Sequence, residues 1–311
     1  GRDSLYVWTD TALFLMTFVG APFTFSFQQI GSNCGLIGKN ACVEVDGTAY
    51  WMSENGFFKY DGQIESMDCL VEDFVYDNLN STPRDLINVG LNNLFGEVIW
   101  FYPSGNSLAI NNMVSYNYIE SYSRASPKQA IWTTGTLSRT AWADSAVFDK
   151  PHATYYNIDD DASYDVTGNT DGSTIYYEQE TGTDQIDAGG VTTLIAGTIT
   201  SGDFDITQKR SSTGQSIGMP DLRGDGEFIM RISRFIPDFI SQTGNTQVSF
   251  VTRDYPNSSA TTTNFTTTST TDKIDTRLRA RSIAMKVHNT AVAEDWKLGT
   301  FRLDIHPGGR R

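Results

Sequence analysis

Residues 167–178, TGNTDGSTIYYE, have the types and spacing that could bind a metal ion. Asn169, Asp171 and Glu178 stand at positions three, five and twelve of a calcium-binding loop, where oxygen ligands are expected. Position one would be Thr167, and aromatic strand-forming residues follow where the second helix of such a site should begin. We therefore interpret the segment as an acidic surface loop between strands, and we expect no metal site there.

A second group that could do chemistry is the arginine run LRARSIAMK. It places Arg277, Arg279 and Arg281 on one face of a strand, because side chains alternate along a strand. Clustered arginines are typical of a nucleic-acid contact, and the alternative is an exposed face balanced by some of the 37 acidic residues. The formal net charge of −14 favours the alternative, since an acidic surface repels phosphates. We expect no sequence-specific binding of nucleic acid.

No short motif marks a catalytic centre. The sequence has no Gly-x-Ser-x-Gly elbow, no phosphate-binding glycine loop and no paired-histidine metal motif. The cysteines are typical of reduced, buried thiols, and neither they nor the histidines have metal-binding spacing. These residues are Cys34, Cys42, Cys69, His152, His288 and His306. We expect no catalytic residue, no cofactor and no metal ligand, although the carboxylates of glycosidases would leave no short motif.

The elements that would position such side chains are mostly strands. AYWMSENGFFKYDG, residues 49–62, places five aromatic residues around an Asn-Gly turn, which is a strong hairpin signal. Residues 5–18 and 97–120 repeat this pair of apolar strands, and residues 173–182 look like one more half. The three hairpins begin about 44 and 48 residues apart, which is the length of a propeller blade. We predict propeller-like blades, with an irregular β-meander as the alternative.

One short helix and one domain boundary interrupt this pattern. CLVEDFVYDNLN, residues 69–80, has apolar residues at helical spacing and is the best helix candidate. The composition changes near residues 185–200, and longer strands follow, including the threonine-rich segment 258–273. We predict an all-β chain in which residues 1–195 form propeller-like blades and residues 196–311 form a β-sandwich.

The ends of the sequence and its apolar content indicate whether the chain has a membrane span or a signal peptide. No stretch approaches the roughly 20 apolar residues of a membrane-spanning helix. The chain does not begin with Met, and its opening residues enter a strand without the layout of a signal peptide. We expect it to be the carboxy-terminal part of a longer chain.

Several stretches resemble structural proteins of tailed bacteriophages. They are DSLYVWTDTALFLMTFVG, NCGLIGKNACVEVDGTAYWMSENGFFKYDG, EVIWFYPSG with VSYNY and WTTGTLSRTAW, and the ending DTRLRARSIAMKVHN…WKLGTFRLDIHPGGRR. The sharpest element is this ending, with Trp296, Gly299, Arg302 and Asp304. The resemblance spans most of the chain and is closest in kind to the tail hub and nozzle proteins of short-tailed phages.

The resemblance implies a role in the phage tail. Such a protein forms a homo-oligomeric ring, usually a hexamer, that contacts adaptor and fibre proteins and forms part of the conduit for DNA ejection. It would be located in the virion after assembly in the host bacterial cytoplasm. We therefore predict a non-enzymatic virion component, with a carbohydrate-binding or glycan-cleaving tail protein as the alternative.

Overall fold

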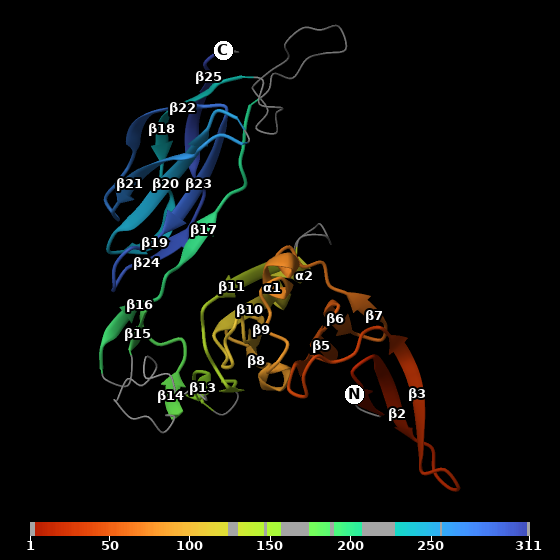
Figure 1. The fold of residues 1–311 in the computed structure, drawn as a ribbon. Helices are drawn as coiled ribbons and strands as arrows, with labels where there is room; N and C mark the ends of the chain where they lie inside the picture. The colour runs from red at the N-terminus through yellow and green to blue at the C-terminus, as the bar shows by residue number, and fades with distance from the viewer. Residues whose placement is uncertain are drawn as a thin grey trace, which may run out of the picture. The chain divides into compact units, whose positions relative to one another are not determined.

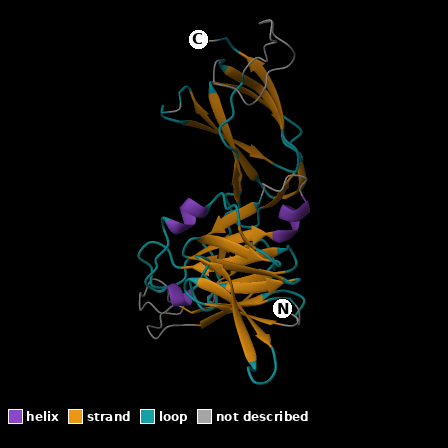
Figure 2. Ribbon diagram, turned by 90° about the vertical axis from the view of Figure 1, so that its right-hand side faces the viewer, coloured by secondary structure: helices purple, strands orange, loops and turns teal. Residues whose placement is uncertain are grey.

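The regular secondary structure of the described residues is almost entirely antiparallel β-sheet. The computed structural model describes residues 4–123, 130–145, 148–156, 174–186, 190–206, 228–255 and 257–309. Helix in these ranges is confined to α1 (Glu72–Tyr76), α2 (Tyr118–Ser123) and the 3-10 turn η1 (Arg84–Leu86) (Figures 1 and 2). The predicted all-β class is confirmed, and α1 lies inside the predicted helix at 69–80. No helix in the described ranges is long and apolar enough to cross a membrane.

The chain divides into two compact units, Gly1–Thr181 (unit 1) and Gly182–Arg311 (unit 2). The sequence places the boundary at 195/196, and the intervening residues are bonded to unit 2. The Asp184 carboxylate accepts a hydrogen bond from the backbone N–H of Ala293 at 2.7 Å, and Asn289 donates its side-chain N–H to the carbonyl of Ile195 at 2.9 Å. These bonds tie the segment before residue 196 to the end of the chain.

The described residues of unit 1 form four antiparallel sheets that follow one another along the chain. The first holds β1 (Ser4–Trp8), β2 (Ala12–Phe18) and β3 (Phe25–Ser32), and the second holds β4 (Cys42–Val45), β5 (Thr48–Ser53), β6 (Gly56–Tyr60) and β7 (Ile64–Ser66). The third holds β8 (Asn88–Asn92), β9 (Glu97–Tyr102), β10 (Asn112–Asn117) and β11 (Ile131–Gly135), and the fourth holds β12 (Ala141–Ala143), β13 (His152–Tyr156) and β14 (Thr174–Glu178). The three predicted hairpins therefore belong to separate sheets, as a propeller-like arrangement requires.

Each sheet of unit 1 packs its aromatic residues against the next sheet along the chain. Leu13 of the first sheet shares a buried cluster with Trp51 of the second. Phe57 of the second sheet lies with its ring centroid 5.0 Å from that of Trp100 in the third. Burying rings of this size removes a large apolar area from water, so these contacts hold the sheets together.

The tryptophans also form a repeated hydrogen bond. In three successive sheets the indole N–H donates to a backbone carbonyl in, or next to, the preceding sheet. The bonds run from Trp51 to Cys34 (2.9 Å), from Trp100 to Ala41 (3.0 Å) and from Trp142 to Leu91 (2.8 Å). The buried indole nitrogen of Trp8, in the first sheet, has no partner among the described residues. The indoles thus fix each sheet to its predecessor at a defined point.

Unit 2 is a β-sandwich. One sheet has the order β17-β23-β20-β21 and the other β22-β18-β25, with the two-stranded sheets β19-β24 and β15-β16 beside them. The strands are β15 (Asp184–Ile186), β16 (Thr192–Leu194), β17 (Thr198–Thr200), β18 (Met230–Ile236), β19 (Phe239–Thr243), β20 (Thr246–Arg253), β21 (Thr261–Thr267), β22 (Ile274–Ala280), β23 (Ser282–His288), β24 (Asp295–Leu298) and β25 (Arg302–Pro307). Phe235 and Phe250, one from each sheet, are fully buried in the shared core. The threonine-rich segment forms β21, whose outer face is exposed.

Replacing Trp100 by Phe should destabilise unit 1. The change keeps an aromatic ring but removes one of the two hydrogen bonds to the carbonyl of Ala41, which also accepts the backbone N–H of Met52 at 3.2 Å, and this loss costs about 0.5–1.5 kcal/mol. Urea unfolding followed by far-UV circular dichroism measures the loss. The matched control is Trp132→Phe, because the indole of Trp132 bonds the carbonyl of Asp68 at an exposed position where water can replace it. Equal losses in the two variants would contradict a special role for the buried bond.

Candidate functional site

Two carboxylates from different sheets of unit 1 come together. Glu97 is the first residue of β9 in the third sheet, and Glu180 lies in the turn after β14 of the fourth. Asn92, which pairs with Glu97 across β8 and β9, donates its side-chain N–H to Oε1 of Glu180 at 2.8 Å. The strand register and this hydrogen bond therefore define a site at the junction of two sheets, which we call the Glu97–Glu180 pair.

The two carboxylates have different surroundings. Burial raises the pKa of Glu97, and the nearby negative charge of Glu180 raises it further. Glu180 is exposed, and its Oε1 accepts the hydrogen bond from Asn92. Glu97 therefore retains its proton to higher pH than an ordinary glutamate does. Such a pair, with one group shifted towards the acid form, has the properties required for general acid–base chemistry.

The backbone at Glu180 is in an unusual conformation. Its φ angle is +56°, in the left-handed region that residues other than glycine seldom adopt. This conformation costs free energy and persists where the surroundings hold it in place. Here the bond from Asn92 holds the side chain. The turn thus directs Glu180 towards the third sheet at some cost to the free energy of folding.

A buried arginine contacts Tyr177 and Gln179, which precede Glu180 in the sequence. Arg139 is 5% exposed, its guanidinium lies 3.9 Å from the ring centroid of Tyr177, and Nη2 donates to Oε1 of Gln179 at 3.5 Å. Burial lowers its pKa to about 10, and the neighbouring Tyr177 acts in the opposite direction. Nε of Arg139 and Oδ1 of Asn92 are buried without a hydrogen-bond partner among the described residues. Such atoms are unusual in a folded interior, where buried polar groups are normally hydrogen-bonded.

An aromatic platform stands on the same sheet as Glu180. The ring of Tyr176, in β14, is 63% exposed and stacks on His152 of β13 with centroids 5.3 Å apart and planes 16° apart. The Tyr176 hydroxyl forms a hydrogen bond with Nδ1 of His152. The ring of Phe148 packs edge-to-face with the imidazole of His152, with ring centroids 4.4 Å apart. An exposed, oriented aromatic surface of this kind can stack against a flat apolar face of a ligand.

The calcium-loop candidate lies largely outside the described residues. Of its proposed ligands only Glu178 is described, in β14, where it accepts a hydrogen bond from Thr181 and lies 3.6 Å from Nζ of Lys150. The described parts of the chain hold no group of three or more His, Cys, Asp or Glu residues arranged to bind a metal ion.

The arginine run is only partly on one face. Arg277 and Arg279 are exposed on β22, as predicted. Arg281 follows the end of the strand, is half-buried, and has its guanidinium carbon 5.7 Å from the ring centroid of Tyr255. The strand therefore presents two of the three arginines on its outer face.

All three cysteines are free thiols. Cys34 is buried, and Cys42 and Cys69 are half-buried. Burial raises the pKa of each thiol, to about 12 for Cys69. The thiols are therefore protonated at neutral pH and unreactive, since the thiolate is the nucleophile.

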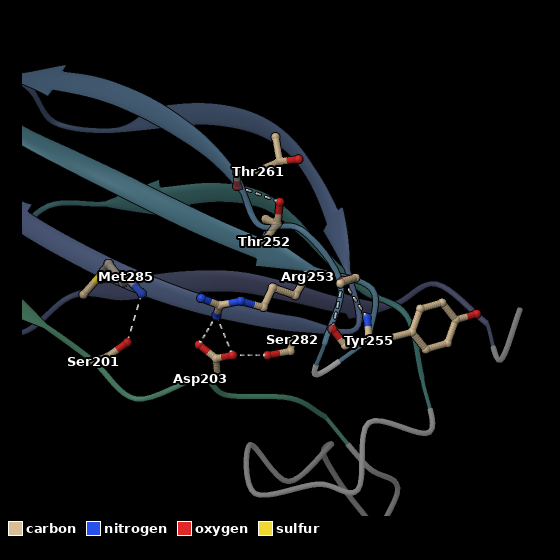
Figure 3. Close-up of polar contacts among 9 residues, drawn as sticks. Ser201, Asp203, Thr252, Arg253, Tyr255, Thr261, Ser282 and Met285 are labelled. Atoms are coloured by element: carbon tan, nitrogen blue, oxygen red, sulfur yellow. Dashed lines mark hydrogen bonds and ion pairs between the residues drawn. The ribbon is translucent and has the colours of Figure 1, made fainter.

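Unit 2 has a polar cluster that fastens the segment after β17 to its sheet (Figure 3). Nη1 of Arg253 donates to both carboxylate oxygens of Asp203, at 2.8 and 2.7 Å, and the hydroxyl of Ser282 donates to Oδ2 of Asp203 at 2.9 Å. Ser201 accepts a hydrogen bond from the backbone N–H of Met285 at 2.9 Å. Every group is paired within the cluster, so we assign it a structural role.

Comparisons with known proteins give only distant likenesses. No family model and no curated protein matches this chain. Among solved structures it is similar to the exo-β-1,3-galactanase of Phanerochaete chrysosporium with galactose, at 9% identity and a TM-score of 0.26, over 95% of this chain and 74% of that one. A structure described as a glycoside hydrolase matches at 10% identity and a TM-score of 0.27, over 98% of this chain and 82% of that one.

These matches contradict the prediction that the chain is not an enzyme. The similar structures are described as glycoside-cleaving enzymes, including the galactanase with β-1,3-galactotriose, and the prediction is therefore not kept. TM-scores below 0.5 assign no activity, so the chemistry must be argued from the residues themselves.

Sequence reasoning missed the Glu97–Glu180 pair. The two glutamates are 83 residues apart and belong to no motif. Only the folding of the third and fourth sheets brings them together, and the raised pKa of Glu97 depends on burial that cannot be seen in the sequence. The one local signal is the aromatic segment 173–182, which contains Glu178 and Glu180 and which the sequence predicts as half a hairpin.

Replacing Glu97 by Gln should stabilise the protein in a pH-dependent way. Folding raises the pKa of Glu97. The contribution of this carboxyl group to the free energy of unfolding is therefore complete below the unfolded pKa of about 4.3 and is lost as the pH rises through the folded pKa. Gln resembles the protonated acid, so the variant should equal the wild type at low pH and exceed it near neutrality. Urea unfolding across a pH series measures this.

Glu178→Gln is the matched control with the opposite sign. The hydrogen bond from Thr181, and then the charge of Lys150, lower the pKa of Glu178. Its stabilisation is present above the unfolded pKa and is lost as pH falls, so the variant should be no more stable than the wild type at neutral pH. A Glu97→Gln difference that did not change with pH would rule out the burial argument.

Proposed function

We propose that unit 1 acts on a glycan, which it binds on the Tyr176 platform and cleaves at the Glu97–Glu180 pair. The observation that carries this proposal is the pair itself: two carboxyl groups from adjoining sheets, one shifted towards its acid form by burial and the other exposed and held by Asn92. Glycoside hydrolysis needs this combination, because one group must give a proton while the other acts as a base or nucleophile.

The chemistry assigns a role to each glutamate. Glu97, in its acid form, donates its proton to the glycosidic oxygen as the bond from that oxygen to the anomeric carbon breaks. Glu180 acts on the opposite side, either by attacking the anomeric carbon or by taking a proton from the water that attacks it. Asn92 positions Glu180 and does not itself react.

The aromatic platform supplies the binding surface. The ring of Tyr176 is exposed and held flat against His152, so it can stack on the apolar face of a sugar ring with little loss of side-chain entropy.

The setting that we propose is the particle of a tailed bacteriophage. The support is the sequence resemblance, together with serial antiparallel sheets that need no disulfide. The substrate would then be a polysaccharide of the host cell surface. The protein would be located in the virion after assembly in the host cytoplasm.

A second candidate is a subunit of a tail ring, of the hub or nozzle type, through which DNA is ejected. The observation that favours it is the hairpin formed by β2 and β3. It carries the exposed phenylalanines Phe18, Phe23, Phe25 and Phe27, and no charged residue occurs between Asp10 and Lys39. Exposed apolar patches of this kind mark contacts with other proteins. In a ring, the hairpin would contact neighbouring tail proteins.

Hydrolysis of host glycans tests the first proposal. Purified chain should release reducing ends from at least one bacterial surface polysaccharide in a panel, and Glu97→Gln should lower the rate about 10²–10⁴-fold by removing the general acid. Glu178→Gln is the control, because this glutamate lies nearby but outside the pair. The panel should also be screened for binding, with Tyr176→Ala as the variant.

The outcomes separate cleavage from binding. Binding that Tyr176→Ala removes, without release of reducing ends, would leave a glycan-binding protein and reject catalysis by the pair. Neither binding nor cleavage on any polysaccharide would reject the glycan-directed function.

An inventory of purified phage particles tests the tail-ring candidate. Quantitative mass spectrometry of particles that encode this chain should find it at a copy number that fits a closed ring, such as six. Its absence from the particle, or a single copy, would reject the ring.

A further inference from the structure

The outer face of one sheet in unit 2 carries like charges directly opposite each other. In the sheet β22-β18-β25, Arg231 of β18 pairs with Arg279 of β22 on one side and with His306 of β25 on the other. All three side chains are exposed. Side chains opposite each other on antiparallel strands lie about 4.5–5.5 Å apart at Cβ, and the like charges of Arg231 and Arg279 in this arrangement are destabilising.

A neighbouring row of the same sheet shows the usual arrangement. There Arg234 lies between Asp275 of β22 and Asp304 of β25, at N to O distances of 2.8 and 3.8 Å. The negative, positive and negative groups alternate across the three strands and compensate one another. The contrast shows that this sheet can compensate its arginines with carboxylates, and does so in only one of the two rows.

The row of like charges is left without counterions from the protein. Arg231, Arg277 and Arg279 make no ion pair within the described part of the chain. Arg253, on the other sheet of the sandwich, is by contrast bonded twice to Asp203. Three guanidinium groups, each able to form two parallel hydrogen bonds with a carboxylate or phosphate, thus remain available on one exposed face. We call Arg231, Arg277 and Arg279 the basic face.

The two units differ strongly in charge. Unit 1 carries 8 Lys and Arg against 23 Asp and Glu, and unit 2 carries 15 against 14, so their formal charges are −15 and +1. The basic face is therefore the positive surface of a protein whose other half is strongly acidic. A positive patch on one molecule and a negative surface on another steer the two together.

We propose that the basic face docks on unit 1 of a second copy of this chain. Such a contact joins two different surfaces, so it can repeat from copy to copy and close into a ring. The inference rests on the charges and not on the glycan-directed function, and its test uses no glycan.

The counterpart on unit 1 is the segment 61–77, which includes α1. It contains six acidic residues and no Lys or Arg, and Asp68, Asp73 and Asp77 are exposed and unpaired in the described structure. The neighbouring side chains of Leu70 and Phe74 are 85% and 58% exposed. Carboxylates beside exposed apolar groups match arginine, whose stem is apolar and whose head is charged.

Nucleic acid is the less favoured occupant. The chain as a whole carries −14, so its long-range field repels a phosphate polymer, whereas unit 1 of another copy attracts the basic face. A duplex DNA and inorganic polyphosphate are included in the test as competing probes.

The test measures self-association of the full chain by analytical ultracentrifugation. The wild type should associate as its concentration rises. Association should weaken between about 0.05 and 0.5 M salt, because the Debye length falls over this range from more than about 10 Å to a few ångströms. Arg279→Glu should raise the dissociation constant about tenfold or more. Lys297→Glu, an equal charge change on the exposed face of β24, should leave it within about threefold.

Two further readouts separate docking from a structural role. Arg279→Glu places a negative group opposite Arg231, so its melting temperature should equal or exceed that of the wild type although association is weakened. By itself, Asp73→Arg should also weaken association. The double variant Asp73→Arg, Arg279→Glu should recover part of the affinity, because each surface then carries the charge that the other had before.

Three outcomes would overturn the proposal. One is a wild type that stays monomeric at all concentrations and low salt. Another is an Arg279→Glu variant that associates like Lys297→Glu. The third is binding of DNA or polyphosphate that depends on Arg279, without any self-association, because this would assign the face to phosphate instead of to a second copy.

Discussion

Unit 1 depends on the hydrogen bond from a buried indole to the sheet that precedes it. A tryptophan offers a large apolar surface and a single donor, so it gains stability from burial only where its N–H reaches an acceptor. Trp51, Trp100 and Trp142 each meet this requirement at a backbone carbonyl of, or beside, the previous sheet. The stacking of sheets is therefore directional as well as apolar, and each sheet has a defined position on its predecessor.

The candidate site lies at one of these junctions. Trp142 fixes the fourth sheet on the third, and the same two sheets bring Glu180 within reach of Asn92 and Glu97. The packing that excludes water from the junction is also what raises the pKa of Glu97. The same packing therefore stabilises the fold and sets the pKa of Glu97. The backbone of Glu180, with its positive φ angle, is the point where the geometry of the site lowers the stability of the fold.

Much of the fold could be predicted from the sequence, because hairpins and short helices are encoded locally. The aromatic residues around the Asn-Gly turn of residues 49–62 specify β5 and β6, and the helical spacing in residues 69–80 locates α1. The site could not be predicted, since Glu97 and Glu180 acquire their relation only through the packing of separate sheets. The cross-strand row at Arg231 was equally hidden, because it depends on the register of three strands that are far apart in sequence.

The order of strands has a consequence for synthesis on the ribosome. Each described strand of unit 1 pairs only with its neighbours along the chain, so each sheet can form soon after it emerges and can receive the next one. In unit 2, β17 pairs with β23, and β18 needs both β22 and β25. These pairings give unit 2 a high contact order, which slows folding. The sandwich cannot close until its last strand has been translated, and its unpaired edges remain open to solvent and chaperones until then.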